Sequence, residues 1–129
     1  MPAKRAFISF DFDHDESLRY LLVGQAKNPD SPFSIVDYSV KEPMTGDWEK
    51  KVTSRIARTE LTIIICGQHT HTAEGVTAEL FITRDQRNPY FLLAGYADKT
   101  CTKPRGATDS DKMYKWTWDN LKSLIAGAR

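Results

Sequence analysis

Glu79 is the acidic residue whose sequence neighbours most favour chemistry. It lies in a segment with helical periodicity, and Val76 and Thr83 fall about one turn to either side, on the face expected to meet a sheet. A carboxylate partly withdrawn from water there could stabilise a developing cation or position a ribose hydroxyl. Patterning alone favours an exposed glutamate on a surface helix, and the neighbours Val76 and Thr83 keep the first interpretation open.

A polar segment precedes this helix and is a candidate for ligand contacts. Residues 61–66 (LTIIIC) are apolar and largely β-branched, which predicts a central strand buried on both faces. The segment 67–72 (GQHTHT) follows, and parallel sheets bind ligands outside the carboxyl ends of their strands. Gly67, Gln68 and His69 are therefore candidate binding residues.

Two patterns resemble metal sites, but neither is complete. The acids of 11–15 (DFDHD) alternate as in a calcium loop, yet Glu16 stands where the sharp turn needs glycine, and no glutamate follows at the twelfth position. The two histidines of 67–72 are more typical of surface groups or ligand contacts than of a metal corner. We therefore predict no metal site, and we expect Asp13 or Asp15 to cap the following helix.

Several enzyme classes lack their sequence signatures. A phospho-receiver domain needs an aspartate at the end of the third strand, where this chain has Cys66. The chain contains no G-x-S-x-G elbow, no G-x-G-x-x-G fingerprint and no Walker loop. These absences argue against a serine hydrolase, a Rossmann-type dinucleotide enzyme and a P-loop nucleotidase.

Composition is that of an ordinary globular protein. The 129 residues are 40% hydrophobic and 27% charged, and 18 basic residues nearly balance 17 acidic ones, which argues against disorder and against a nucleic-acid-binding surface. Cys66 and Cys101 do not suggest a disulfide framework, so a reducing compartment is the simpler interpretation. No apolar stretch approaches the ~20 residues of a membrane span, and no signal region precedes the first strand. We expect a soluble cytoplasmic protein without nucleic-acid or membrane partners.

Strand and helix patterns alternate along the whole chain. This alternation predicts an α/β fold of flavodoxin-like type, a parallel sheet of four to five strands in the order 2-1-3-4-5 with helices on both faces. Strands are predicted at 5–10, 33–38, 61–66, 90–96 and 113–116. The order places the turn 9–13 beside the loop 67–72, with the loop 39–46 and Glu79 on the rim of the same crevice. Asp37, near the end of the second strand, is a further candidate binding residue.

Helical periodicity also predicts caps and inward faces. Asp47 should cap the second helix and Thr117 the last one. The apolar stripes expected to face the sheet are Leu18, Leu21, Leu22 and Ala26 in the first helix, and Trp48, Val52 and Ile56 in the second.

The order of these motifs resembles that of a TIR domain. The resemblance is greatest to the bacterial TIR-like group of Thoeris antiphage-defence sensors, the ThsB-like group, and it extends over about residues 5–125. The matching segments are FISF at 7–10, IVDYS at 35–39, the loop 42–46 before Trp48, TIIICG at 62–67 and VTAEL at 76–80.

This resemblance implies both a fold and a chemistry. Residues 1–129 would form one TIR-like domain that cleaves the nicotinamide–ribose bond of NAD, with NAD as substrate and no cofactor. The catalytic glutamate of the family corresponds to Glu79 through the V-x-x-E-L match. Ser9, Phe10 and Asp11 would line the nicotinamide and ribose end, and Val76 stands where many TIR domains have an aromatic residue.

The leading hypothesis from the sequence is therefore an enzyme of antiphage defence. It would convert NAD to a linear or cyclic ADP-ribose-derived nucleotide, which would switch on a separate effector protein. The alternative is a non-catalytic module that assembles with other TIR domains through the loop 39–46 and the helix after it. A third interpretation is a nucleotide-binding sensor without turnover. Self-association through TIR–TIR contacts is expected for TIR enzymes as well.

Overall fold

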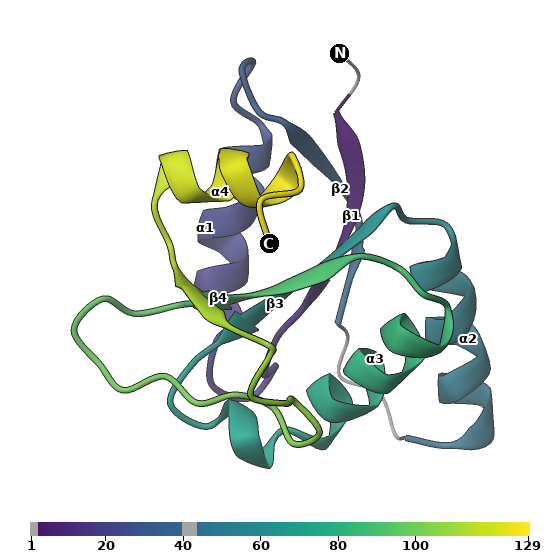
Figure 1. The fold of residues 1–129 in the computed structure, drawn as a ribbon. Helices are drawn as coiled ribbons and strands as arrows, with labels where there is room; N and C mark the ends of the chain where they lie inside the picture. The colour runs from purple at the N-terminus through teal and green to yellow at the C-terminus, as the bar shows by residue number, and fades with distance from the viewer. Residues whose placement is uncertain (1–2, 40–43) are drawn as a thin grey trace.

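The apolar run Leu61–Cys66 forms the central strand, β3, and every one of its six residues is buried. The structure is a computed structural model that describes residues 3–39 and 44–129. β3 pairs in parallel with β1 (Lys4–Ser9) on one side and with β4 (Tyr90–Ala94) on the other. β2 (Phe33–Tyr38) and β5 (Met113–Lys115) complete the sheet at its two edges (Figure 1). The predicted α/β fold with strand order 2-1-3-4-5 is confirmed.

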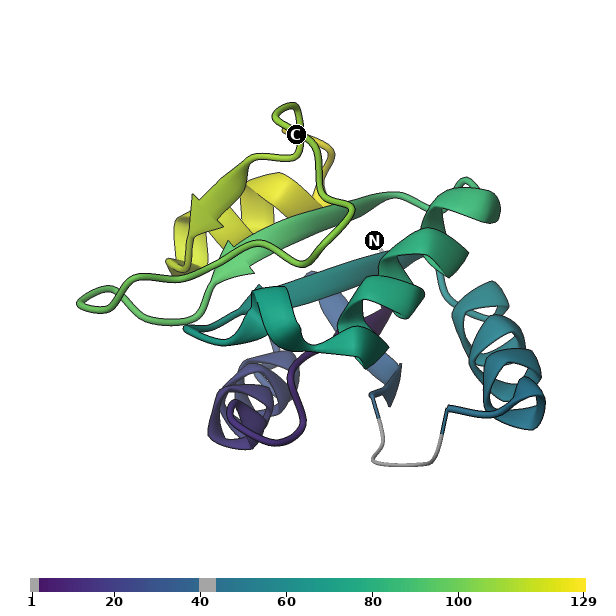
Figure 2. The same cartoon turned by 90° about the horizontal axis from the view of Figure 1, so that it is seen from below.

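Two helices cover each face of this sheet. α1 (Glu16–Ala26) and α4 (Trp118–Ile125) lie on one face, and α2 (Gly46–Ala57) and α3 (Glu74–Asp85) lie on the other (Figures 1 and 2). α1, α2 and α3 each connect two parallel strands, and α4 follows β5. Because all the strands are parallel, each has its carboxyl end at the same edge of the sheet. The functional residues predicted after separate strands therefore meet at that edge.

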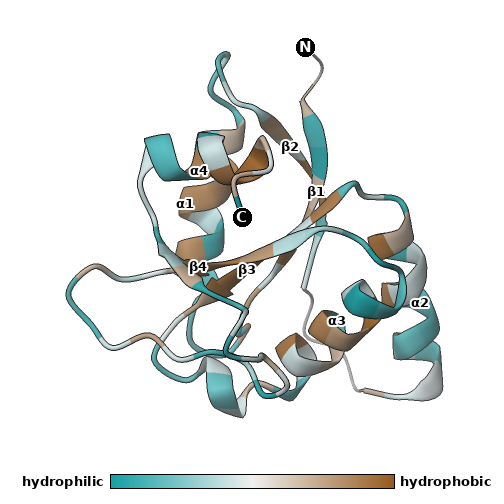
Figure 3. Ribbon diagram, in the orientation of Figure 1, coloured by the Kyte–Doolittle hydropathy of each residue, from teal (hydrophilic) through white to brown (hydrophobic). Residues whose placement is uncertain are grey.

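Apolar side chains fill the space between sheet and helices. Apolar residues recur along α1 and α4 (Figure 3), and Leu18, Leu22 and Leu121 among them pack with residues of the sheet. On the other face, Trp48, Val52 and Ile56 of α2 pack with Phe7, as predicted from their spacing. Val76 and Leu80 of α3 pack on Ile64 of the central strand. Burial of side chains of this size stabilises a fold by roughly 1.5–3 kcal/mol each.

The face of α1 differs from the prediction at one position. Leu21, expected to face the sheet, is 61% exposed, whereas Arg19 is buried. The Arg19 guanidinium lies 4.1 Å from the ring centroid of Tyr20 and 4.3 Å from that of Tyr38 at the end of β2. Cation–π contacts of this kind let a buried arginine take a place that an apolar stripe assigns to leucine.

Helix caps were predicted correctly at one helix and wrongly at two. The Thr117 hydroxyl accepts the Asn120 N–H and caps α4, as expected. For α2, however, the cap is Thr45, which accepts the Trp48 N–H, and Asp47 lies inside the first turn. Asp15 occupies the N-cap position of α1 but its side chain makes no capping hydrogen bond, so the predicted carboxylate cap is also wrong.

Arg84 of α3 bonds to the long segment between β4 and β5, residues 95–112. Arg84 donates to the Gly106 carbonyl at 2.7 Å and pairs with the carboxylate of Asp111. Tyr90 donates to the same carboxylate at 2.6 Å, so strand, helix and loop are joined at one point. No described helix combines the length and apolarity that crossing a membrane requires.

Candidate active site

Glu79 lies buried on α3 and is 2% exposed, so the surface-glutamate interpretation is wrong. The hydroxyls of Ser9 and Ser39 both donate to its Oε1, at 2.7 and 2.5 Å. No donor in the described part of the chain is placed on Oε2. One carboxylate oxygen is thus held by the protein, and the other is available to a ligand.

Strand pairing explains why these three residues meet. Ser9 ends β1, and Ser39 follows β2, whose register with β1 places the two strand ends side by side. The Ser39 N–H donates to the Ile8 carbonyl at 2.9 Å, and its hydroxyl accepts the Phe10 N–H at 3.2 Å. The carboxyl edge of the sheet therefore places the hydroxyls of Ser9 and Ser39 next to the same carboxylate oxygen of α3.

The buried position changes the acidity of Glu79. Loss of hydration raises its pKa to about 7, while the hydrogen bonds from Ser39 and Ser9 act in the opposite direction. The positive charge of Arg55, which pairs with Asp37 at 3.4 Å, also lowers the pKa. The carboxyl group is consequently poised to change its charge near neutral pH.

A cleft of about 330 Å³ opens above Glu79. Its walls come from the turn after β1, the start of α2 and the N-terminal end of α3. Residues 10–14, Ser39, Met44, Trp48, residues 72–76 and Glu79 line it. Four of these are acidic, and none is a lysine or arginine, so the described walls of the cleft favour a cationic group over an anionic one.

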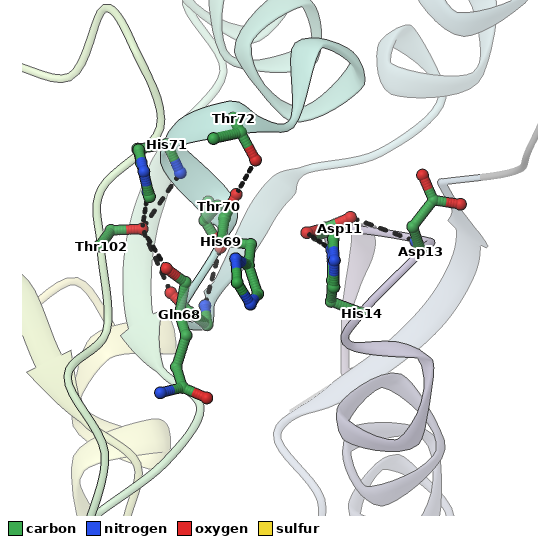
Figure 4. Close-up of polar contacts among 10 residues, drawn as sticks. Asp11, Asp13, His14, Gln68, His69, Thr70, His71, Thr72 and Thr102 are labelled. Atoms are coloured by element: carbon green, nitrogen blue, oxygen red, sulfur yellow. Dashed lines mark hydrogen bonds and ion pairs between the residues drawn. The ribbon is translucent and has the colours of Figure 1, made fainter.

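The acidic turn after β1 is organised around Asp11. The carboxylate of Asp11 accepts the Asp13 N–H at 3.1 Å and lies 2.6 Å from Nδ1 of His14 (Figure 4). These contacts hold the turn closed on itself and leave Asp11 buried at the cleft. Within the described residues, no group of three histidine, cysteine or acidic side chains could hold a metal ion.

The polar segment 67–72 lies beside the cleft, and only its last residue lines it. The ring of His69 stacks on that of His14 at a centroid distance of 4.2 Å, which joins the segment to the acidic turn (Figure 4). The Thr102 hydroxyl oxygen accepts the backbone N–H of His71 at 3.1 Å and lies 2.9 Å from Nδ1 of the His71 ring. Gln68 is exposed, so this segment mainly supports the cleft from the side.

The predicted site residues thus fall into two groups. Glu79, Phe10, Asp11 and Val76 line the cleft, and Ser9 lies directly behind Glu79. Asp37, Gly67, Gln68 and His69 are not among the described lining residues. The predicted loop 39–46 contributes Ser39 and Met44 to the cleft, and its residues 40–43 lie outside the described part of the chain.

Sequence reasoning missed the contribution of Trp48 and of the α3 N-terminus. Trp48 was predicted as a core residue, and it is one, but it also lines the cleft. Residues 73–75 reach the cleft because α3 begins there, and the Ala73 N-cap makes no side-chain cap. The position of Trp48 at the cleft could have been predicted, since Trp48 follows closely after the loop 39–46, which the strand order brings to the crevice.

Comparison with known families places this geometry in context. The family model described as Thoeris protein ThsB, TIR-like domain, matches residues 7–100. The chain belongs to this family. The match runs from within β1 into the segment after β4, so the Thoeris TIR-like region includes every described residue of the cleft. No curated protein matches the sequence.

Proposed function

We propose that this Thoeris TIR-like domain cleaves NAD at the nicotinamide–ribose bond, with Glu79 as the catalytic carboxylate. The observation that carries the proposal is the position of Glu79, at the base of a cleft with Oε1 bound by two serines and Oε2 free of described donors. NAD is the substrate in this scheme and is consumed. Family membership supports a role in antiphage defence.

The chemistry needs one well-placed negative charge. As the bond between the nicotinamide nitrogen and ribose C1′ breaks, its electron pair leaves with neutral nicotinamide, and positive charge develops on the ribose. The Glu79 carboxylate would stabilise that charge, and its free oxygen could hold a ribose hydroxyl. Attack of water on C1′ then yields ADP-ribose and a proton. Capture of C1′ by a nitrogen of the same molecule's adenine yields a cyclic product instead.

The acidic cleft suits the nicotinamide end of this substrate. The nicotinamide ring of NAD is cationic, and the described lining residues carry acidic groups without a balancing lysine or arginine. A bound cation near Glu79 lowers the pKa of its carboxyl group and favours the ionised form that the reaction needs. Aromatic rings of Phe10, Phe12 and Trp48 supply apolar surface in the same cleft.

NAD consumption by the purified chain tests the proposal. The assay compares the wild type with Glu79→Gln at several protein concentrations, with and without crowding agent or lysate from phage-challenged cells, and separates the products by chromatography. Glu49→Gln is the matched control, because Glu49 is an exposed glutamate of α2 outside the cleft lining. Release of nicotinamide by wild type and Glu49→Gln, but not by Glu79→Gln, supports the enzyme.

Two results would contradict it. Turnover by a folded Glu79→Gln variant would remove Glu79 from the chemistry. No turnover by any folded form under any of these conditions would favour the non-catalytic assembly module, and its partner would then be sought through the loop after β2. The nucleotide product of an active enzyme would serve as a signal for a separate effector protein.

A further inference from the structure

A second concave surface lies at the far end of the same sheet edge and shares no lining residue with the cleft. We call it the aromatic cavity. It has a volume of about 340 Å³ and lies where β4 and β5 end, next to α1. Tyr96, Trp116 and Trp118 line it with Leu21, over a floor formed by Ala94 and Gly95. None of these side chains has a role in the function proposed above.

A glycine lies between the aromatic cavity and the core. A Cβ at Gly95 would lie 2.3 Å from Cδ1 of Leu18 and 3.1 Å from the Cys66 carbonyl oxygen, so the missing side chain lets α1 and the end of β3 approach this backbone closely. On the cavity side, the lining includes the aromatic residues Tyr96, Trp116 and Trp118. Aromatic walls suit a planar ring, which would bury apolar surface against them.

Polar groups at the aromatic cavity suggest what the ring carries. Trp116 Nε1 donates to Gln25 Oε1 at 2.8 Å, so the oxygen of this lining amide is already bonded, and its NH₂ group is the part that could donate to a ligand. Lys115 lines the cavity, and the Lys99 ammonium lies 4.6 Å from the ring centroid of Tyr96. Lys122 is nearby over Trp118 but pairs with Asp119, so Lys99 and Lys115 are the cations of interest.

We propose that the aromatic cavity binds an adenine nucleotide. The aromatic walls and the Gln25 amide would hold the base, since a nucleobase combines a flat apolar face with hydrogen-bonding edges. Lys115 and Lys99 would attract the phosphate at the mouth. The position fits as well, because ligands of parallel sheets bind at the carboxyl ends of strands. This binding does not depend on turnover, so it stands or falls separately from the proposed NAD cleavage.

The three tryptophans provide a direct test, since Trp48 lines the cleft while Trp116 and Trp118 line the aromatic cavity. AMP is titrated into full-length protein, and the three indole N–H signals, assigned with single Trp→Phe variants, are followed by NMR. We expect AMP to move the Trp116 and Trp118 signals in a saturable way. Absence of such shifts, or AMP-dependent shifts confined to Trp48, would overturn the proposal.

Charge reversal at two lysines near β5 distinguishes a direct phosphate contact from a general effect of protein charge. Lys115→Glu should weaken AMP binding about fivefold to tenfold and leave adenosine binding nearly unchanged. Lys112→Glu makes the same charge change three residues away, outside the aromatic cavity, and should alter neither affinity. Equal losses in the two variants would overturn the assignment of the phosphate to Lys115. Leu21→Glu, at an exposed wall position, should abolish binding of both ligands without unfolding the protein.

Discussion

At the level of single residues, the burial of Glu79 lowers the stability of the folded protein above acidic pH. Its buried carboxyl group has a pKa of about 7, whereas the same group titrates near 4.5 when unfolding exposes it. Between these values the folded protein binds more protons than the unfolded chain, so its free energy of unfolding falls as pH rises from about 4.5 to 7. Above pH 7 the full penalty is present, roughly 3 kcal/mol from the difference in pKa.

Glu79→Gln should therefore stabilise the protein at alkaline pH while removing activity. Glutamine keeps the oxygen that accepts the two serine hydroxyls but carries no charge to desolvate, so we expect a gain of roughly 1–2 kcal/mol at pH 8, or about 5 °C in melting temperature. At pH 4.5 the difference should vanish. Thermal denaturation across this range measures it, with Glu49→Gln as control. Equal loss of stability at both pH values would show that the charge is not the cause.

Ser9 tests how the protein holds the ionised form. Ser9→Ala removes a hydrogen bond that lowers the pKa of Glu79, so that pKa should rise further, by roughly one pH unit. The ¹³C chemical shift of the Glu79 carboxyl group, followed by NMR through a pH titration, reports this directly. Ser39→Ala should act in the same direction and also destabilise the fold, because the buried Phe10 N–H loses its acceptor. An unchanged or lowered pKa in Ser9→Ala would contradict the proposed balance.

At the level of elements, the segment after β3 lies close to the start of α1, and the contact is between Gly67 and Asp15. A Cβ at Gly67 would lie 2.2 Å from Oδ2 of Asp15, a buried oxygen without a hydrogen-bond partner among residues 3–39 and 44–129. Burial, together with the neighbouring carboxylate of Asp11, raises the pKa of Asp15. The backbone of Gly67 does not itself require glycine, since only the contact excludes a side chain.

Gly67→Ala should therefore destabilise the protein by about 2–3 kcal/mol through overpacking. Denaturant unfolding measures the loss. Adding Asp15→Ala should recover much of it, since that change removes the atoms with which the new methyl group collides and a carboxyl group that is costly to bury. A double variant that is simply the sum of two losses would contradict this explanation.

Arg84 should control the order of the segment 95–112. It bonds Gly106 and Asp111 within that segment, and Arg84→Met keeps the apolar stem while removing these bonds. Amide hydrogen exchange in the segment should become roughly tenfold faster, with α1 unaffected. Arg58→Met, at an exposed position, serves as the control. Unchanged exchange in Arg84→Met would show that the ion pair does not hold the segment.

The bounds of helices and strands were predictable where the local sequence pattern determines them. The predicted ranges of β2 and β3 agree with the structure because unbroken apolar runs between breakers specify buried strands. The burial of Arg19 on α1 was not predictable, because its guanidinium lies against the ring of Tyr38, which belongs to another element. Similarly, Thr45 and Asp47 both stand at the start of α2, and only the loop geometry selects Thr45 as its cap.

At the level of the whole molecule, strand order carried most of the information about the site. Right-handed parallel crossovers allow few arrangements, and the predicted one already brought Ser9, the loop after β2 and Glu79 together. The burial of Glu79 could not be predicted in this way. It depends on contacts with serines 70 and 40 residues away, which follow from register and helix rotation and leave no local pattern.

The rate of nicotinamide release as a function of pH shows whether an ionised Glu79 acts in NAD cleavage. If an ionised Glu79 stabilises the ribose cation, kcat/KM of the wild type should rise about tenfold per pH unit below pH 7 and level off above it. Glu79→Gln should lose at least about a thousandfold in rate and show no such rise. A wild-type profile that is flat between pH 5 and 8, or a Glu79→Gln variant that retains the wild-type rate, would contradict the account.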